Sequence, residues 1–329
     1  MKRVKELPPI RETVSDYDKI EAEIKKVFRE EFYKPLLDIL KEPEEILSNA
    51  KDDALKKALQ AGRVTFSYGT FYGRLTASIS RQIRSLGATW DTKTATYKIN
   101  LKDLPAEIQD VIRSSESKMK RKLARIDEKL SKILPEEIAD KMKVTEIFEA
   151  SLWKTNQSIA KTLKAISIPP ELTPNMEKKI AHEYRDNLKL DIKKFTTKQV
   201  ETLRDRVREH TFAGNRYHDL IKEIQASYGV TQNKAKFLAR QETSLLMTKY
   251  KEAKYTEAGV LEYRWQCVVG SPKHPVRPRH KELNGTVHKW SEPPVTSEDG
   301  EPERRNNPGQ DYNCRCVAIP IVRFSKAGK

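Results

Sequence analysis

The stretch that decides the C-terminal fold opens with Trp265-Gln-Cys-Val-Val and closes with Asn313-Cys-Arg-Cys-Val-Ala-Ile-Pro320. All three cysteines of the 329-residue chain, Cys267, Cys314 and Cys316, lie within it. Three of the six histidines and two of the four tryptophans lie there too. Chance would scatter these residue types, so their clustering predicts one compact, rigid domain built around them.

The cysteines and histidines of this stretch suit a structural zinc ion. Cys314 and Cys316 are two residues apart, so their side chains point to opposite faces of a strand, whereas in a turn both can reach one ion. The preceding Pro308-Gly309 pair favours a turn. Cys267 and one histidine would complete a Cys3His set, which is typical of closed, tetrahedral zinc sites. The candidate histidines are His274, His280 and His288.

Two other interpretations of the cysteines stay open at this point. The thiols can be small buried residues in loops that Trp265 and Trp290 hold in place, or Cys267 and Cys314 can form a disulfide. The spacing is looser than that of the usual Cys-x-x-Cys zinc knuckle, because the position that would complete such a pair after Cys267 is Gly270.

Composition limits the partners and the compartment. The net charge of +16 and the pI near 9.5 make a polyanion such as DNA, RNA or an acidic protein surface the leading partner class, with a generally basic surface as the alternative. No apolar run approaches the roughly 20 residues that cross a bilayer. The start of the chain lacks the apolar core of a signal peptide. We therefore expect a cytosolic protein without a membrane segment.

The N-terminal third divides into two predicted segments. Residues 1–60 are expected to form an extended arm or poorly ordered tail over 1–15, then a helix from Asp16 and a second helix from Pro43 to about Leu59. Residues 61–112 predict a small basic α+β module, with a strand near residues 64–68, a helix over 71–86 and a hairpin over 88–99. Its basic residues lie among aromatic ones, which favours nucleic-acid binding, although solvated arginines around an aromatic core are the alternative. The candidate contacts in this module are Arg63, Arg74, Arg81 and Arg84.

The middle of the chain has a helical period almost throughout. Residues 113–168 predict a long helical segment beginning near Ser117, whose basic cluster of Lys120, Arg121 and Lys122 is either a solvated face or a DNA contact. The prolines at 169, 170 and 174 mark a domain boundary. Residues 169–263 predict further helices, with breaks before Thr196 and at Gly229, where Thr196 and Thr231 would act as caps. Residues 264–329 then form the Cys/His-rich C-terminal domain.

Several spaced motifs resemble one family. The order Trp, Arg-x-x-His-x-x-Leu-x-Gly, Pro-Pro and Cys-Arg-Cys is similar to the C-terminal signature of the minor head proteins of tailed bacteriophages, also called the phage head morphogenesis family. The matching positions are Trp265, Arg277, His280, Leu283, Gly285, Pro293, Pro294, Cys314, Arg315 and Cys316. The resemblance makes His280 the preferred fourth metal ligand. On the matching Ala-Arg-x-Glu helix, Arg240 and Glu242 either brace the cysteine-rich end through buried polar bonds or have a plain surface role.

The resemblance implies a structural, non-enzymatic protein of the phage head. Such a protein would contact portal and capsid proteins in the host cytoplasm during assembly and then remain in the head interior. The basic charge of the chain is consistent with sequence-independent contacts to packaged double-stranded DNA. The expected fold is α+β and mainly α, with an elongated helical middle and a compact, loop-rich C-terminal domain with short strands. The alternative is a DNA-binding protein or a metal-dependent nuclease of the histidine-asparagine-histidine type, suggested faintly by Asn284. The histidine spacing does not fit such a nuclease.

Overall fold

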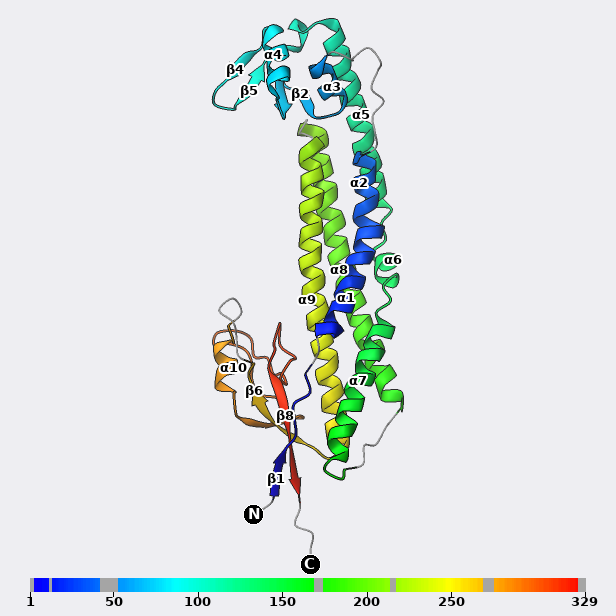
Figure 1. The fold of residues 1–329 in the computed structure, drawn as a ribbon, viewed down its shortest axis with the longest axis vertical. Helices are drawn as coiled ribbons and strands as arrows, with labels where there is room; N and C mark the ends of the chain where they lie inside the picture. The colour runs from blue at the N-terminus through cyan, green and yellow to red at the C-terminus, as the bar shows by residue number, and fades with distance from the viewer. Residues whose placement is uncertain are drawn as a thin grey trace, which may run out of the picture. The chain divides into compact units, whose positions relative to one another are not determined.

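The structure is a computed structural model that describes residues 3–11, 14–41, 53–168, 174–213, 217–268 and 275–324. Its described residues are mainly helical and include two four-stranded antiparallel sheets, which confirms the predicted α+β, mainly α fold (Figure 1). None of the described helices is both long and apolar enough to span a bilayer. The chain divides into two compact units, each assembled from segments distant in sequence. Unit 1 comprises Met1–Lys26, Asp140–Asp191 and Gln232–Lys329, and unit 2 comprises Val27–Ala139 and Ile192–Thr231. The five consecutive segments expected from the sequence stay a prediction.

Unit 1 contains the sheet of the C-terminal domain, in the strand order β1-β8-β6-β7. Its strands and short helix are β1 (Arg3–Glu6), β6 (Glu262–Gln266), α10 (Pro278–Glu282), β7 (Val287–Lys289) and β8 (Val317–Phe324). Of the two alternatives predicted for the start of the chain, Arg3–Glu6 fits an extended arm, and it is not a poorly ordered tail. It pairs antiparallel with β8 of the same chain (Figure 1). The following Leu7 is buried, and its amide donates to the carbonyl of Pro320 at 2.9 Å.

Helices pack beside this sheet to complete unit 1. They are α1 (Val14–Val27), α7 (Thr145–Lys164), and the parts of α8 (Pro174–Ala213) and α9 (Tyr217–Glu257) that belong to the unit. Phe148 and Leu152 of α7 are fully buried, as are Leu246 and Tyr250 of α9. The Tyr250 hydroxyl donates to Glu177 of α8 at 2.6 Å, so the two long helices are joined by a polar contact as well as by apolar packing.

The long helices α8 and α9 lack the breaks that the sequence predicts. Thr196 lies inside α8, where its hydroxyl donates to the carbonyl of Ile192 at 2.8 Å. Gly229 and Thr231 lie inside α9, where the Thr231 hydroxyl donates to the carbonyl of Ser227 at 3.1 Å. A threonine side chain that bonds back four residues satisfies its own hydroxyl within the helix. These threonines are therefore interior residues, and neither one caps a helix.

Unit 2 has a helical part in which a π-helical segment, Phe28–Tyr33, links α1 to α2 (Lys34–Lys41). Pro35 lies within this continuous helical stretch. Tyr33 is buried, and its hydroxyl lies 2.7 Å from Thr231 Oγ1 of α9 and 3.3 Å from Gln199 Oε1 of α8. The remaining helices of this part are α5 (Ala106–Ser131) and α6 (Pro135–Asp140). The first of these begins eleven residues earlier than the predicted start at Ser117.

The predicted α+β module is present in unit 2 as a sheet of order β2-β3-β5-β4. Its elements are α3 (Ala54–Gln60), β2 (Val64–Ser67), β3 (Thr70–Gly73), α4 (Ala77–Ser85), β4 (Thr89–Asp91), β5 (Thr96–Lys98) and a 3-10 turn at Leu101–Asp103. The predicted first strand and the later hairpin are confirmed. The helix expected over 71–86 begins later, at Ala77. Tyr68 and Gly69 turn the chain with positive φ, so Phe71 lies in β3 and pairs with Phe66. Much of the helix predicted from Pro43 lies outside the described residues, and α3 begins at Ala54.

Candidate metal centre

Strand β6 and the turn after α10 are joined by main-chain bonds around one buried tryptophan, beside the group of His280, Cys314 and Cys316 (the Cys/His group). Trp265 of β6 is fully buried; its carbonyl accepts from the amide of Gly285, and its amide donates to the carbonyl of Thr286. Those two residues end the turn that follows α10, so strand and helix are held together. The ring of His280, on α10, packs edge-on against Trp265 with ring centroids 5.4 Å apart. The large apolar ring of Trp265 thus holds the imidazole of His280 in place.

The loop that carries Cys314 and Cys316 is anchored to one face of α9. The hydroxyl of Ser244 donates to the carbonyl of Gly309 at 2.8 Å, and that of Thr248 donates to the carbonyl of Pro308 at 3.0 Å. The Gln241 amide oxygen accepts from the backbone amide of Asn313 at 2.8 Å. Gly309 has φ +92°, and a Cβ there would lie 2.7 Å from the Thr248 hydroxyl. Only glycine fits this contact without strain.

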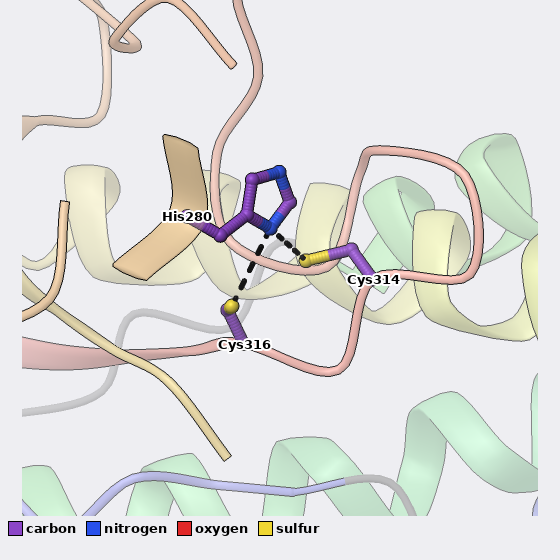
Figure 2. A group of neighbouring side chains, drawn as sticks. All are labelled: His280, Cys314 and Cys316. Carbon is purple, nitrogen blue, oxygen red and sulfur yellow. Dashed lines mark hydrogen bonds between the residues drawn. The ribbon is translucent and has the colours of Figure 1, made fainter. Parts of the chain in front are cut away.

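The side chains of His280, Cys314 and Cys316 converge on one point. His280 Nδ1 lies 3.6 Å from the Sγ atom of Cys314 and 3.6 Å from that of Cys316 (Figure 2). The three ligand atoms all lie within 4.8 Å of one another. Zn–N and Zn–S bonds of about 2.0 and 2.3 Å at tetrahedral angles place nitrogen and sulfur about 3.6 Å apart. The observed separations therefore match those of ligands around a single zinc ion.

The far side of the imidazole has the partner that a metal-binding histidine requires. His280 Nε2 lies 3.2 Å from the Oδ2 atom of Asp311, which is buried. Arg277 makes an ion pair with the Asp311 carboxylate at 3.2 Å, and its positive charge favours the ionised form of that carboxylate. When the imidazole is neutral, a carboxylate that accepts from Nε2–H selects the tautomer whose Nδ1 lone pair faces the sulfur atoms. The orientation seen in Figure 2 is thus the one that metal coordination needs.

Electrostatics around the group favour a positive charge between the sulfur atoms. Burial lowers the pKa of His280, but its bonds to Asp311 and Cys314 outweigh that effect and raise the pKa to about 9. The hydrogen bond from Cys316 lowers the pKa of the Cys314 thiol, assisted by the imidazolium of His280. The same bond raises the pKa of Cys316. The site thus stabilises one thiolate beside a cation, and a metal ion would supply that cation directly.

The position of Cys267 partly meets the Cys3His prediction. Its Sγ atom lies 3.6 Å from that of Cys316, but the thiol donates to the carbonyl of His280 and is not one of the three mutually close ligands. All three cysteines are free thiols in the structure, so the alternative disulfide between Cys267 and Cys314 is absent. The ring of His288 bonds to the hydroxyl of Thr286, and His274 lies outside the described residues. Cys267 is therefore the nearest candidate for a fourth ligand.

Arg240 and Glu242 of α9, which were expected either to brace this domain or to lie on the surface, differ in burial. Arg240 is exposed and lines a pocket beside the Cys/His group. Glu242 is buried, and burial together with the charge of Asp191 on α8 raises the pKa of its carboxyl to about 7. The residues of α9 that hold the cysteine loop are Gln241, Ser244 and Thr248, which the sequence reasoning missed. Gln241, Ser244 and Thr248 follow a helical spacing of three and four, so a polar stripe on this helix was the signal that could have revealed them.

The other residues of the C-terminal motif lie near the Cys/His group. Leu283 is buried at the end of α10, and Gly285 takes a positive φ of 84° in the turn that follows. Arg315 is exposed between the two cysteines. Asp311 was not predicted, because no sequence pattern separates it from the other acidic residues of the loop.

The candidate nucleic-acid residues are exposed with one exception. Arg63, Arg74, Arg81 and Arg84 are exposed on the α+β module, and Lys120 and Arg121 are exposed on α5. Lys122 is 9% exposed, and its ammonium group lies 3.4 Å from the carbonyl of Leu40. The prediction that Lys122 contacts DNA is therefore wrong, because this side chain is directed into unit 2.

The fold and the site together define a mainly helical protein with a small β domain, in which His280, Cys314 and Cys316 form a candidate metal-ligand group. Residues 201–319 match the family model described as Phage Mu protein F like protein. This match confirms the predicted resemblance to the phage head morphogenesis family, and it includes α9 and the candidate ligands.

One curated protein shares part of this sequence. It is an uncharacterized protein of Haemophilus influenzae, 28% identical over 150 residues, which are 46% of this chain and 31% of that protein. The chain thus matches less than a third of this relative's length. No solved structure matches the chain.

Proposed function

We propose that this protein is a structural minor component of a phage or prophage head that contacts portal and capsid proteins during assembly. The observation that carries the proposal is the family match over residues 201–319, which include the anchored cysteine loop and the candidate ligands. In this proposal the protein resides in the host cytoplasm during assembly and then in the head interior. It has no enzymatic role.

The Cys/His group supports a structural role for the C-terminal domain. His280, Cys314 and Cys316 are each less than a tenth exposed. Structural zinc sites are closed by protein ligands, whereas catalytic ones keep a position open to water. We assign zinc as the preferred ion because two thiolates and an imidazole are the donors it favours. The ion would fix α10 and the cysteine loop to each other on the surface of α9.

Assembly can be tested by co-expression with the genes that flank the coding gene, followed by purification of heads. We expect the protein to sediment with heads and to remain bound after a salt wash that removes loosely attached proteins. A matched preparation without the portal gene should contain much less of it. If the protein stays in the soluble fraction in both preparations, a role in the head is excluded.

DNA contact is a second candidate activity, favoured by the exposed arginines of the α+β module. Lys56 and Lys98 of the module pair with Glu107 and Asp91, so their charges are partly neutralised. The arginines at 63, 74 and 81 make no ion pair with any described residue. Free cations on one small module suit a phosphate backbone, in a contact that is independent of sequence and weakens with salt.

A gel shift with duplex DNA at low salt tests this contact. Replacing Arg63, Arg74, Arg81 and Arg84 with glutamine is expected to weaken binding at least about tenfold and to reduce the salt dependence. The matched control replaces four exposed lysines elsewhere, Lys178, Lys179, Lys194 and Lys236, and removes the same total charge. Equal losses in both variants would assign the binding to net charge alone. Cleavage of plasmid DNA with Mg²⁺ or Mn²⁺ in the same assay would favour the nuclease alternative.

A further inference from the structure

A pocket of about 640 Å³ opens beside the Cys/His group, within unit 1. Its walls come from the segment after β1, from α1, from α9 and from the loops that flank α10 and precede β8. Its volume lies in the range of sites that hold small molecules. It is much larger than a metal ion needs, so the Cys/His group does not account for it.

Four arginines from four separate segments line this pocket. They are Arg11 after β1, Arg240 on α9, Arg277 before α10 and Arg315 between the cysteines. Among the described residues that line the pocket, none is aspartate or glutamate. Guanidinium groups that line one space repel one another unless negative charge lies nearby, and Asp311 supplies such a charge to Arg277. The pocket is therefore suited to a ligand with more than one negative charge.

The surrounding chain holds the guanidinium of Arg277 and the backbone beside Arg11. Arg277 pairs with Asp311 and donates to the carbonyl of Tyr312 at 2.5 Å, so its guanidinium is fixed at the pocket wall. Arg11 follows Ile10, whose carbonyl accepts from the ammonium group of Lys251 at 2.8 Å. Arg240 makes no hydrogen bond or ion pair with any residue that the structure describes. Its donors can thus serve a ligand without first losing another partner.

We propose that this pocket binds a phosphate monoester carried on an organic group of about nucleotide size. A phosphate monoester has three terminal oxygens and a charge near −2, which suits several guanidinium forks better than a carboxylate, with its single charge and two oxygens. The walls also contain Tyr17, Val268, Val276 and Val317, which offer an aromatic ring and apolar surface to the organic part. Two sources share this chemistry: a free mononucleotide, and the phosphorylated 5′ end of a nucleic-acid strand.

Calorimetric titration of the full-length protein at low salt tests the proposal. Adenosine 5′-monophosphate is expected to bind and adenosine is not, because only the former has the phosphate. Arg240→Gln is expected to weaken binding about tenfold, the effect of one charge-assisted contact. The control Lys236→Gln lies one turn away on the same helix, is exposed and does not line the pocket, so it should change the affinity less than about twofold.

A second variant and three further ligands make the outcome decisive. Arg11→Gln should repeat the loss, and the melting temperature of each variant should match that of the wild type. An oligonucleotide with a 5′ phosphate that binds more tightly than the nucleotide, and more tightly than its 5′-hydroxyl form, assigns the site to strand ends. Equal binding of the nucleotide and the phosphorylated strand assigns the site to the phosphate group alone. The proposal is overturned if no phosphate ligand binds, if both arginine variants bind as well as wild type, or if a glutamate-rich peptide binds more tightly with the same arginine dependence.

Discussion

The variant Cys316→Ser is expected to lose bound zinc and to melt more than about 10 °C below the wild type. Cys316 Sγ lies 3.6 Å from His280 Nδ1 and 3.6 Å from Cys267 Sγ, so it is the sulfur atom that links all the candidate ligands. A structural zinc ion in a small domain contributes about 10 kcal/mol or more of apparent folding free energy. Losing even a third of that contribution lowers the melting temperature of a domain of this size by about 10 °C. Differential scanning calorimetry measures the change.

Two controls separate loss of the metal from loss of packing. With a strong chelator present, the wild type and Cys316→Ser should melt close together, because both are then metal-free. Cys267→Ser should have a smaller effect, since Cys267 is partly exposed and its thiol is bonded to the carbonyl of His280. If Cys316→Ser and the wild type have the same melting temperature in the absence of chelator, Cys316 is an ordinary buried residue and not a metal ligand.

The variant Glu242→Gln is expected to stabilise the protein at pH 8 by up to about 3 kcal/mol. Glu242 is 5% exposed, and burial with the nearby Asp191 raises its pKa from the usual 4.5 to about 7. Between these two pH values the folded protein holds a proton that the unfolded chain has released. The free energy of unfolding therefore falls as pH rises through this window, and levels off above about pH 7. Glutamine keeps the shape of the protonated acid and never ionises.

The size of this effect follows from the shift in pKa. Each pKa unit corresponds to about 1.4 kcal/mol, so the full difference is present only above pH 7. Urea titrations of both proteins at pH 8 and pH 5 give the comparison, and at pH 5 the two should differ by less than about 1 kcal/mol. Asp191→Asn is the matched control; it removes the second cause of the shift and should give a smaller gain at pH 8. An advantage of the same size at both pH values would show that ionisation of Glu242 is not the cause.

The fold class and the Cys/His group could be predicted because both depend on local patterns. Helical periods and the clustering of cysteines and histidines are visible in the sequence alone, and His280, Cys314 and Cys316 do lie together. The long helices were divided wrongly at Thr196 and Gly229, where a residue favoured at helix ends is accommodated inside. The threonine hydroxyl bonds to the carbonyl four residues earlier. Propensity is a weak signal when tertiary packing surrounds the residue.

The contacts that complete the site could not be predicted, because they join residues far apart in sequence. Asp311 acts on His280 from a different segment, and Gln241 holds Asn313 across 72 positions. The pairing of Arg3–Glu6 with β8 connects the two ends of the chain. No local pattern specifies such pairings, since register and partner are chosen by the assembled core. The same reason explains the missed pocket, whose arginines come from four separate segments.

The most direct test of this account is elemental analysis of the full-length protein purified without added metal. We expect about one zinc ion per chain, retained through dialysis and released by a strong chelator together with a fall in melting temperature. A protein that contains no metal as purified, binds none when zinc is added, and melts unchanged with chelator would contradict the assignment of His280, Cys314 and Cys316 as a structural metal centre.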